Sequence, residues 1–279
     1  MGERLEFHSR SGLRLAAEAS GDPRHDPVVL LHGGGQTRHA WGDTAQVLAD
    51  RGWYSISVDL RGHGDSDWCP QGDYLLDAFA DDVVSVVSQL ARPAVLVGAS
   101  LGGLASMVAL GEPRFGMSAR ALVLVDVGTH LEPGGVERIS SFMRARPEGY
   151  ASIEEAANAV AEYQSRRPRP ADLEGLRKNL RRTPEGRWRW HWDPRFLSGV
   201  VPESGRLESA ARQLRLSTLL VRGRTSDMLS VEGARAFLEL VPHASFEDVA
   251  DAGHMVAGDR NDAFTQVVAG FLTRLRDRS

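Results

Sequence analysis

A serine stands between small residues in the run 98–102, which reads Gly-Ala-Ser-Leu-Gly. The apolar residues 94–97 before it are typical of a buried strand, and residues 101–110 after it are typical of a helix. A serine at such a strand-to-helix turn is held in a strained backbone conformation, and small neighbours let the strand and the helix approach each other. The helix N-terminus also directs N–H groups at the turn, which favours an anion there. We therefore predict that Ser100 is a nucleophile.

A serine hydroxyl is a poor nucleophile unless a neighbouring base takes its proton. Among the nine histidines, His254 lies between the last predicted strand, residues 245–249, and the last predicted helix. Loops at the carboxyl ends of parallel strands are where such a sheet builds its site. We therefore predict that His254 is the base.

The base needs a carboxylate that holds its tautomer and stabilises the imidazolium. Asp227 follows the predicted strand 218–221 and gives the order Ser, Asp, His along the chain. Asp126, which directly follows the strand 121–125, is the alternative acid, because it lies at the same edge of the sheet. We favour Asp227 and leave Asp126 open.

Acyl transfer also needs donors for the oxyanion that develops on the substrate. The run 32–36, His-Gly-Gly-Gly-Gln, follows a predicted strand, and its glycines leave backbone N–H groups unshielded. The N–H groups of Gly34 and Leu101 are the predicted oxyanion donors. Gly33 and Gly35 are expected beside the substrate.

The same glycine-rich run does not fit a nucleotide site. No Gly-Lys-Ser/Thr follows it, as a phosphate-binding loop requires, and the spacing is not Gly-x-Gly-x-x-Gly. His32 is expected to hold the loop rather than to act as a base.

Short continuous apolar runs alternate with longer helix-like segments, a pattern typical of a parallel sheet covered on both faces. The runs are residues 28–31, 54–58, 94–97, 121–125 and 218–221, and the helix-like segments are 38–50, 75–91, 101–110, 231–240 and 262–275. Residues 4–8 and 14–19 predict an antiparallel hairpin at the edge. We therefore expect an α/β fold with a doubly wound, mostly parallel sheet.

This alternation stops between residues 129 and 206, where the sequence becomes polar and helix-like with several prolines. We predict a helical cap over residues 129–206, inserted between core segments 1–128 and 207–279. Its large apolar side chains either line a substrate pocket or only pin the cap to the core. They are Phe142, Met143, Trp188, Trp190 and Trp192.

Together these residues resemble the α/β-hydrolase superfamily over essentially the whole chain. The run 59–66, Asp-Leu-Arg-Gly-His-Gly-Asp-Ser, looks like a structural loop of the branch with epoxide hydrolases, haloalkane dehalogenases, haloperoxidases and carbon–carbon bond hydrolases. The resemblance implies an eight-stranded sheet with the cap after the sixth strand, and no catalytic role for His63 or Asp65. Epoxide hydrolases and dehalogenases carry aspartate where this chain has Ser100. The family's proline shortly after the acid is absent after Asp227.

The composition of the chain limits the kinds of partner that we expect it to bind. The net charge is −4, with 33 basic and 37 acidic residues, which favours neither nucleic acid nor an anionic membrane as a partner. Cys69 is the single cysteine, and no apolar run is long enough to span a bilayer. The first residues lack the apolar region of a signal peptide. We expect a cytoplasmic protein, and the sequence implies no metal or cofactor.

The expected substrate is a carboxylic ester or lactone of a mainly apolar small molecule, cleaved through an acyl-enzyme. A carbon–carbon bond hydrolase or a cofactor-free perhydrolase could use the same triad. A non-catalytic small-molecule receptor could use the same fold. The oligomeric state is not readable from the sequence.

Overall fold

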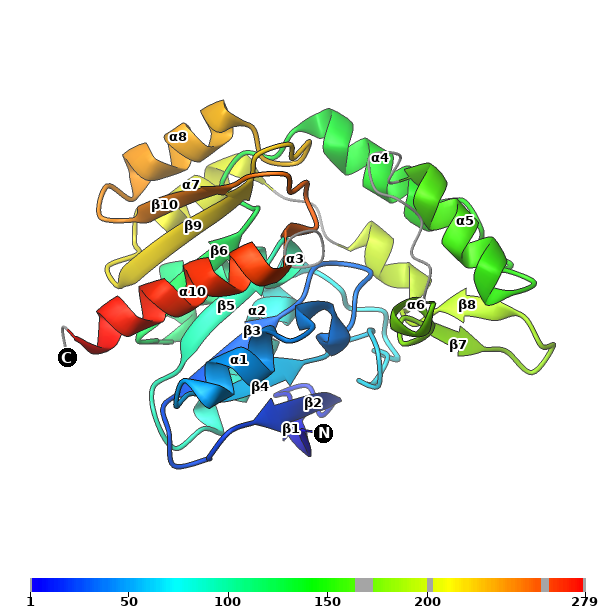
Figure 1. Cartoon of the computed structure of the whole chain (residues 1–279), viewed down its shortest axis with the longest axis horizontal. Coiled ribbons are helices and arrows are strands. Elements are labelled where there is room, and N and C mark those ends of the chain that lie inside the picture. The colour runs from blue at the N-terminus through cyan, green and yellow to red at the C-terminus, as the bar shows by residue number, and fades with distance from the viewer. Residues whose placement is uncertain (1, 164–172, 200–202, 257–260, 278–279) are drawn as a thin grey trace.

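The apolar runs, the N-terminal hairpin and the last predicted strand form one sheet of eight strands (Figure 1). A computed structural model describes residues 2–163, 173–199, 203–256 and 261–277. The strands are β1 (Glu3–His8), β2 (Arg14–Ser20), β3 (Pro27–Leu31), β4 (Tyr54–Val58), β5 (Val95–Ala99), β6 (Ala121–Val125), β9 (Ser217–Gly223) and β10 (Ser245–Val249). Their order is β1-β2-β4-β3-β5-β6-β9-β10, and β2 pairs antiparallel with both β1 and β4. The other neighbouring strands are parallel, so the predicted fold class and the N-terminal hairpin are confirmed.

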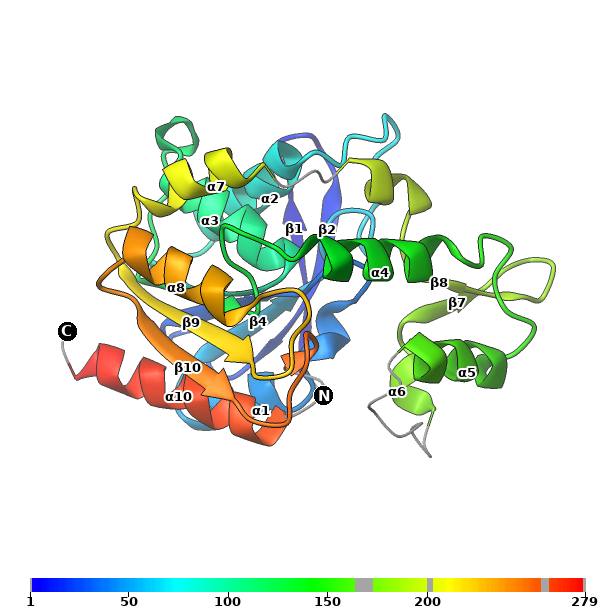
Figure 2. The same cartoon turned by 90° about the horizontal axis from the view of Figure 1, so that it is seen from above.

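Helices cover both faces of the sheet (Figure 2). On one face, α2 (Leu76–Ser88), α3 (Leu101–Gly111), α7 (Ser204–Ala211) and α8 (Val231–Leu240) pack over a common apolar core. On the other face, α1 (Thr44–Asp50) and α10 (Asn261–Arg276) cover a second core. The central strands β3, β5, β6 and β9 are buried on both sides, which explains why they contain continuous apolar runs.

One predicted helix is divided in two. Residues 38–50 form a short 3-10 helix, η1 (Arg38–Trp41), and then α1. The break falls at Gly42, whose φ of 51° lies in the left-handed region that ends a right-handed helix.

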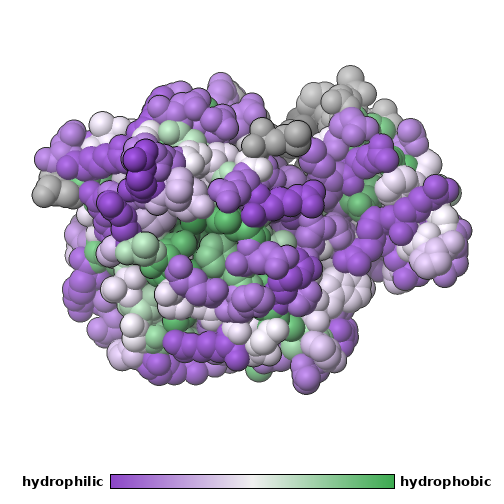
Figure 3. Space-filling model, turned by 90° about the horizontal axis from the view of Figure 1, so that it is seen from below, coloured by the Kyte–Doolittle hydropathy of each residue, from purple (hydrophilic) through white to green (hydrophobic). Residues whose placement is uncertain are grey.

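Most of the elements between β6 and β9, though not α7 (Ser204–Ala211), form a separate lobe at the right of Figure 1, which has a mainly hydrophilic surface in Figure 3. It contains α4 (Pro133–Arg144), α5 (Ile153–Tyr163), α6 (Glu174–Arg177), β7 (Leu180–Arg182), β8 (Trp188–Trp190) and η3 (Pro194–Ser198). The predicted helices are accompanied by an antiparallel hairpin of β7 and β8, which the sequence analysis did not predict. Tryptophan alternates with polar residues over positions 188–192, and this period of two is the strand signal.

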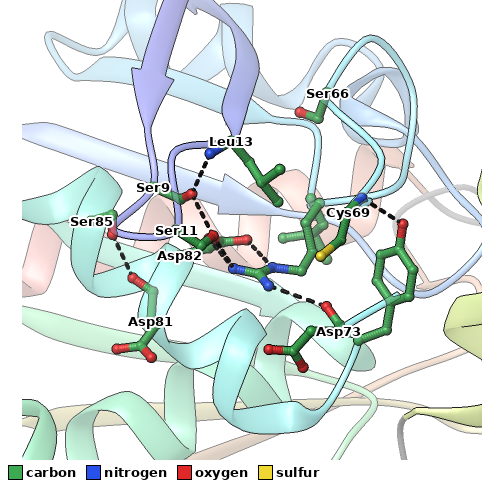
Figure 4. Close-up of polar contacts among 12 residues, drawn as sticks. Ser9, Ser11, Leu13, Ser66, Cys69, Asp73, Asp81, Asp82 and Ser85 are labelled. Atoms are coloured by element: carbon green, nitrogen blue, oxygen red, sulfur yellow. Dashed lines mark hydrogen bonds and ion pairs between the residues drawn. The ribbon is translucent and has the colours of Figure 1, made fainter. Parts of the chain in front are cut away.

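A buried ion pair joins the loop after β4 to α2. The Arg61 guanidinium donates to both carboxylate oxygens of Asp82 at 2.6 Å, and to the Asp73 carbonyl at 3.2 Å. Figure 4 shows Asp82, Asp73 and Ser11 gathered around this guanidinium. In this bidentate pair, each buried charge is compensated by the other, and either would be costly to bury alone. The pair also holds the loop after β4 in place.

The face of the molecule in Figure 3 is mainly hydrophilic. Figure 3 shows one hydrophobic area near the middle of the main body on that face. Within the described ranges, no helix has both the length and the apolar character that a bilayer crossing requires.

Candidate active site

Ser100 sits at the sharp turn between β5 and α3. Its φ of 44° and ψ of −113° are sparsely populated for a residue with a side chain, and such strain costs on the order of 1–3 kcal/mol. Its N–H donates to the Val125 carbonyl at 3.1 Å, which anchors the turn to the neighbouring strand. A methyl group at Gly102 would lie 2.3 Å from the Leu31 carbonyl oxygen. Glycine is therefore required where α3 meets the end of β3.

His254 lies in the loop after β10 and is paired with a carboxylate. Its Nδ1 is 2.7 Å from Asp126 Oδ2, and the Asp126 side chain is fully buried at the end of β6. Asp126 has a positive φ of 51°, which is uncommon for a residue other than glycine and occurs where the chain leaves β6. A second oxygen of the same carboxylate accepts the Gly223 N–H at 2.9 Å. The carboxylate is thus positioned to hold the imidazole with its proton on Nδ1.

Asp227, the favoured acid in the sequence, is placed elsewhere. Its half-buried carboxylate pairs with Arg138 of α4. The structure therefore brings the alternative acid, Asp126, to His254, and the predicted Asp227–His254 pairing is corrected. The physical reason is reach: Asp126 is the first residue after β6 and stays at the sheet edge, while Asp227 lies four residues beyond Gly223, the end of β9.

In the glycine-rich loop after β3, some backbone N–H groups donate hydrogen bonds within the protein and others do not. The Gly33 N–H donates to Gln36 Oε1 at 2.9 Å, and the Gly35 N–H donates to His63 Nε2 at 3.1 Å. Within the described residues, the Gly34 N–H has no such partner, nor does the N–H of Leu101 at the first position of α3. These two N–H groups therefore remain the predicted oxyanion donors.

Two buried histidines hold this loop in place. His32 bonds the Gly33 carbonyl through Nδ1 at 2.8 Å and accepts the Leu60 N–H through Nε2 at 3.0 Å. His63 bonds the Arg61 carbonyl through Nδ1 at 2.9 Å. Burial lowers the pKa of His32 to about 4, and burial, followed by the neighbouring His32, lowers the pKa of His63 to about 3. Both rings are therefore neutral structural groups at neutral pH.

A pocket opens above Ser100. Its lining residues are Gly33, Gly34, Gln36, Ala40, Trp41, Ala99, Ser100, Val125, Ile139, His254, Met255 and Val256. Ser100, His254, Gly33 and Gly34 were singled out in the sequence, and they meet here. Apart from His254, the lining carries no ionisable side chain.

Several of the lining residues were missed in the sequence. Ile139 comes from α4, while Met255 and Val256 directly follow His254. Met255 and Val256 could have been named from the sequence, because they directly follow His254. Nothing local marks Ile139, because only the packing of α4 against the core brings it to the pocket.

The predicted aromatic side chains form a stack beside this pocket rather than its lining. Trp190 and Trp192 are stacked with ring centroids 5.1 Å apart, and Phe142 meets the edge of Trp190 at 5.9 Å. Trp188 packs on the small core of Tyr150, Ala156 and Leu180.

Gly35 and Met143 are in contact with each other instead. A methyl group at Gly35 would lie 2.5 Å from Met143 Cε and 3.4 Å from the Trp192 ring. Of the two interpretations open from the sequence, this arrangement favours pinning the segment to the core.

An eight-stranded, mostly parallel sheet with a strained serine after its fifth strand and a histidine after its last strand is typical of α/β-type hydrolases. The chain belongs to the Alpha/beta hydrolase family, whose pattern matches residues 28–267.

Its relatives are named as hydrolases. The chain is 29% identical to esterase Rv0045c of Mycobacterium tuberculosis, over 97% of this chain and 88% of that protein. It is 28% identical to a 3-hydroxybutyrate-oligomer hydrolase of Cupriavidus necator, over 88% and 89%. The crystal structure of E-2-(acetamidomethylene)succinate hydrolase has the same fold, with a TM-score of 0.84 at 21% identity, covering 98% and 100%. The protein is thus a hydrolase of esterase type.

Proposed function

We propose that this protein is a serine hydrolase that cleaves uncharged carboxylic esters or lactones through an acyl-enzyme. The observation that carries the proposal is the His254–Asp126 pair, 2.7 Å apart, at the pocket that also contains Ser100. The names of the relatives support ester cleavage, and the apolar lining supports an uncharged acyl or alcohol group.

In the first step, Ser100 Oγ attacks the substrate carbonyl carbon while its proton passes to His254 Nε2. Asp126 remains ionised, keeps the other imidazole proton on Nδ1 and stabilises the imidazolium. The carbonyl oxygen becomes an oxyanion that accepts the N–H groups of Gly34 and Leu101. His254 then donates its proton to the leaving alkoxide as the carbon–oxygen bond breaks.

In the second step, water attacks the ester formed on Ser100, and His254 takes a proton from this water. Collapse of the second tetrahedral intermediate releases the carboxylic acid, and the proton returns from His254 to Ser100 Oγ. The balance requires one water per ester cleaved and no other reactant.

The segment between β6 and β9 serves in this proposal as a cap that sets specificity. Its helix α4 supplies Ile139 to the pocket, and its aromatic stack lies next to the glycine loop. Helix α7 belongs to the core instead, because a methyl group at Gly111 of α3 would lie 2.2 Å from the Ala210 carbonyl oxygen. In this proposal the cap ends before residue 204, whereas the sequence analysis predicted its end at residue 206.

The test uses p-nitrophenyl esters and a fluorophosphonate probe. We expect Ser100→Ala to lose turnover by a factor on the order of 10⁴ or more and to lose labelling. Ser106→Ala is the matched control, since this buried serine of the same helix only bonds the Gly102 carbonyl. Retained turnover in Ser100→Ala contradicts the proposed nucleophile. A wild-type protein that is never labelled, yet binds apolar ligands, indicates a receptor instead.

Charge discrimination is a separate test of the pocket. An ester with an uncharged acyl chain should have a kcat/KM at least about tenfold above that of an equally long acyl chain ending in a carboxylate, because the lining offers that charge no cation. Equal or higher kcat/KM for the charged ester contradicts the proposed substrate class.

A further inference from the structure

The loop after β9 reaches back to the carboxylate that holds His254. Ser226 Oγ is 2.5 Å from Asp126 Oδ2, the same oxygen that lies 2.7 Å from His254 Nδ1. With the Gly223 N–H on the other oxygen, the buried Asp126 carboxylate is met by three donors. Several donors are what a carboxylate needs to stay ionised away from water.

The direction of the Ser226 hydroxyl is fixed by its other contacts. Ser226 Oγ accepts the N–H groups of Met228 at 3.0 Å and Leu229 at 3.3 Å. A hydroxyl has two acceptor positions and one donor proton. Because two backbone N–H groups occupy the acceptor positions, the proton is directed at Asp126.

The loop that carries Ser226 is also tied to the loop that carries His254. The Arg224 N–H donates to the Val249 carbonyl, and the Thr225 N–H donates to the Ala252 carbonyl, both at 2.9 Å. The Thr225 hydroxyl reaches the same Ala252 carbonyl at 3.0 Å. Three loops, after β6, β9 and β10, therefore meet as one hydrogen-bonded unit.

We propose that Ser226 is a positioning residue of the triad. Its hydroxyl orients the Asp126 carboxylate so that Oδ2 receives the His254 proton, and it joins the loop after β9 to the charge-bearing pair. This role rests on the proposed function, since it concerns the same acid and base. The competing interpretation is that Ser226 only closes a turn through the Met228 and Leu229 N–H groups.

A matched pair of substitutions separates these roles. Ser226→Ala and Ser230→Ala each remove a serine hydroxyl that accepts backbone N–H groups, and Ser230 Oγ accepts only the Gly233 N–H at the start of α8. We expect Ser226→Ala to lower kcat by on the order of tenfold with little change in KM, since a hydrogen bond to a charged group is lost. Ser226→Thr, which keeps the hydroxyl, should recover most of this loss. Ser230→Ala should lower the melting temperature but leave kcat unchanged. Equal kcat in all four proteins overturns the proposal.

A second experiment tests the same proposal by moving the carboxylate from position 126 to position 226. Asp126→Asn should lower kcat by on the order of 10³–10⁴, as expected when the histidine loses its charged partner. Adding Ser226→Asp to it places a carboxylate on the neighbouring loop, while the amide at position 126 can still accept the Gly223 N–H. We expect the double variant to recover at least about tenfold over Asp126→Asn alone. A folded double variant that recovers nothing contradicts the proposal that the side chain at position 226 reaches the oxygen of Asp126 that meets His254.

A measurement that needs no substrate tests the positioning role of Ser226 separately from the proposed hydrolase function. The most downfield imidazole N–H proton resonance, assigned to His254 by its absence in His254→Gln, reports the bond to Asp126. It should shift in Ser226→Ala and stay in place in Ser230→Ala, even if no ester is hydrolysed. An unmoved resonance in Ser226→Ala overturns the positioning role, whereas an inactive wild type with the expected shift overturns only the proposed function.

Discussion

Histidines stand on two sides of the same pocket in opposite surroundings. On one side, the loops after β3 and β4 bury His32 and His63, and both ring nitrogens of each are bonded to backbone groups. On the other side, His254 lines the pocket, and its Nδ1 meets the carboxylate of Asp126. A ring saturated by backbone partners stays neutral and holds a loop, while a ring backed by a carboxylate can accept a proton. Residue type alone therefore says little about role, and partners and burial decide it.

The largest test of this comparison removes the carboxylate from one side. We expect Asp126→Asn to lower kcat by on the order of 10³–10⁴, because the imidazole loses both its orientation and its charge partner. Asp227→Asn is the matched control and should change kcat by less than about threefold, since Asp227 pairs with Arg138 at the surface. Ester turnover with melting curves for both variants decides. A larger loss in Asp227→Asn would return the acid to the position favoured by the sequence.

The next test removes a ring from the other side. His63→Ala leaves the Gly35 N–H and the Arg61 carbonyl without their partner in a buried site and opens a cavity. We expect it to lower the free energy of unfolding by about 2–4 kcal/mol. Chemical denaturation measures this, with the exposed His25→Ala as control. If His63→Ala is as stable as the control, the loop does not depend on this ring.

Lowering the pH should reveal the buried, neutral state of His32 and His63 without any mutation, through the free energy of unfolding. The folded protein holds His32 and His63 with pKa values of about 4 and 3, against an ordinary value of 6.5. Between these values the unfolded chain binds protons that the folded chain does not, so the free energy of unfolding falls as pH drops from about 6.5 towards 4. Each ring contributes up to about 1.4 kcal/mol per pH unit to this slope.

Denaturation curves at several pH values measure that slope. It should be shallower in His63→Ala than in wild type, and His25→Ala should leave the contribution of the two buried rings intact. An unchanged slope in His63→Ala contradicts a neutral, buried His63.

The smallest expected effect concerns the ion pair that links α4 to the loop after β9. Arg138 is 56% exposed and Asp227 32% exposed, so solvent screens their attraction. We expect Arg138→Ala to lower the free energy of unfolding by at most about 1 kcal/mol and to leave kcat nearly unchanged. A large loss of kcat would show that this contact, and not only Ile139, controls the pocket.

Much of the sheet could be predicted because its signal is local. The bounds of β4, β6 and β10 match those predicted from the sequence, and β6 is apolar and buried at every position, as a strand covered on both faces should be. The β7–β8 hairpin was missed, because prolines and a polar composition favoured a helical interpretation of the whole segment. The alternation of tryptophan with polar residues over 188–192 was the signal that could have predicted it. The break of helix 38–50 depends on one dihedral angle at Gly42.

Ser100, His254 and the two candidate acids could be named from the sequence because each follows a predicted strand, and parallel strands bring their carboxyl ends to one edge. Only the tertiary structure decided between the acids. Asp126 and Asp227 both follow strands, and the choice depends on side-chain direction and on how far a loop departs from the edge. The same holds for Ile139 and Ser226, which reach the site through packing between elements far apart in the chain. Local patterns fix which residues lie at the ends of strands, whereas distances across loops are set by contacts that no local pattern records.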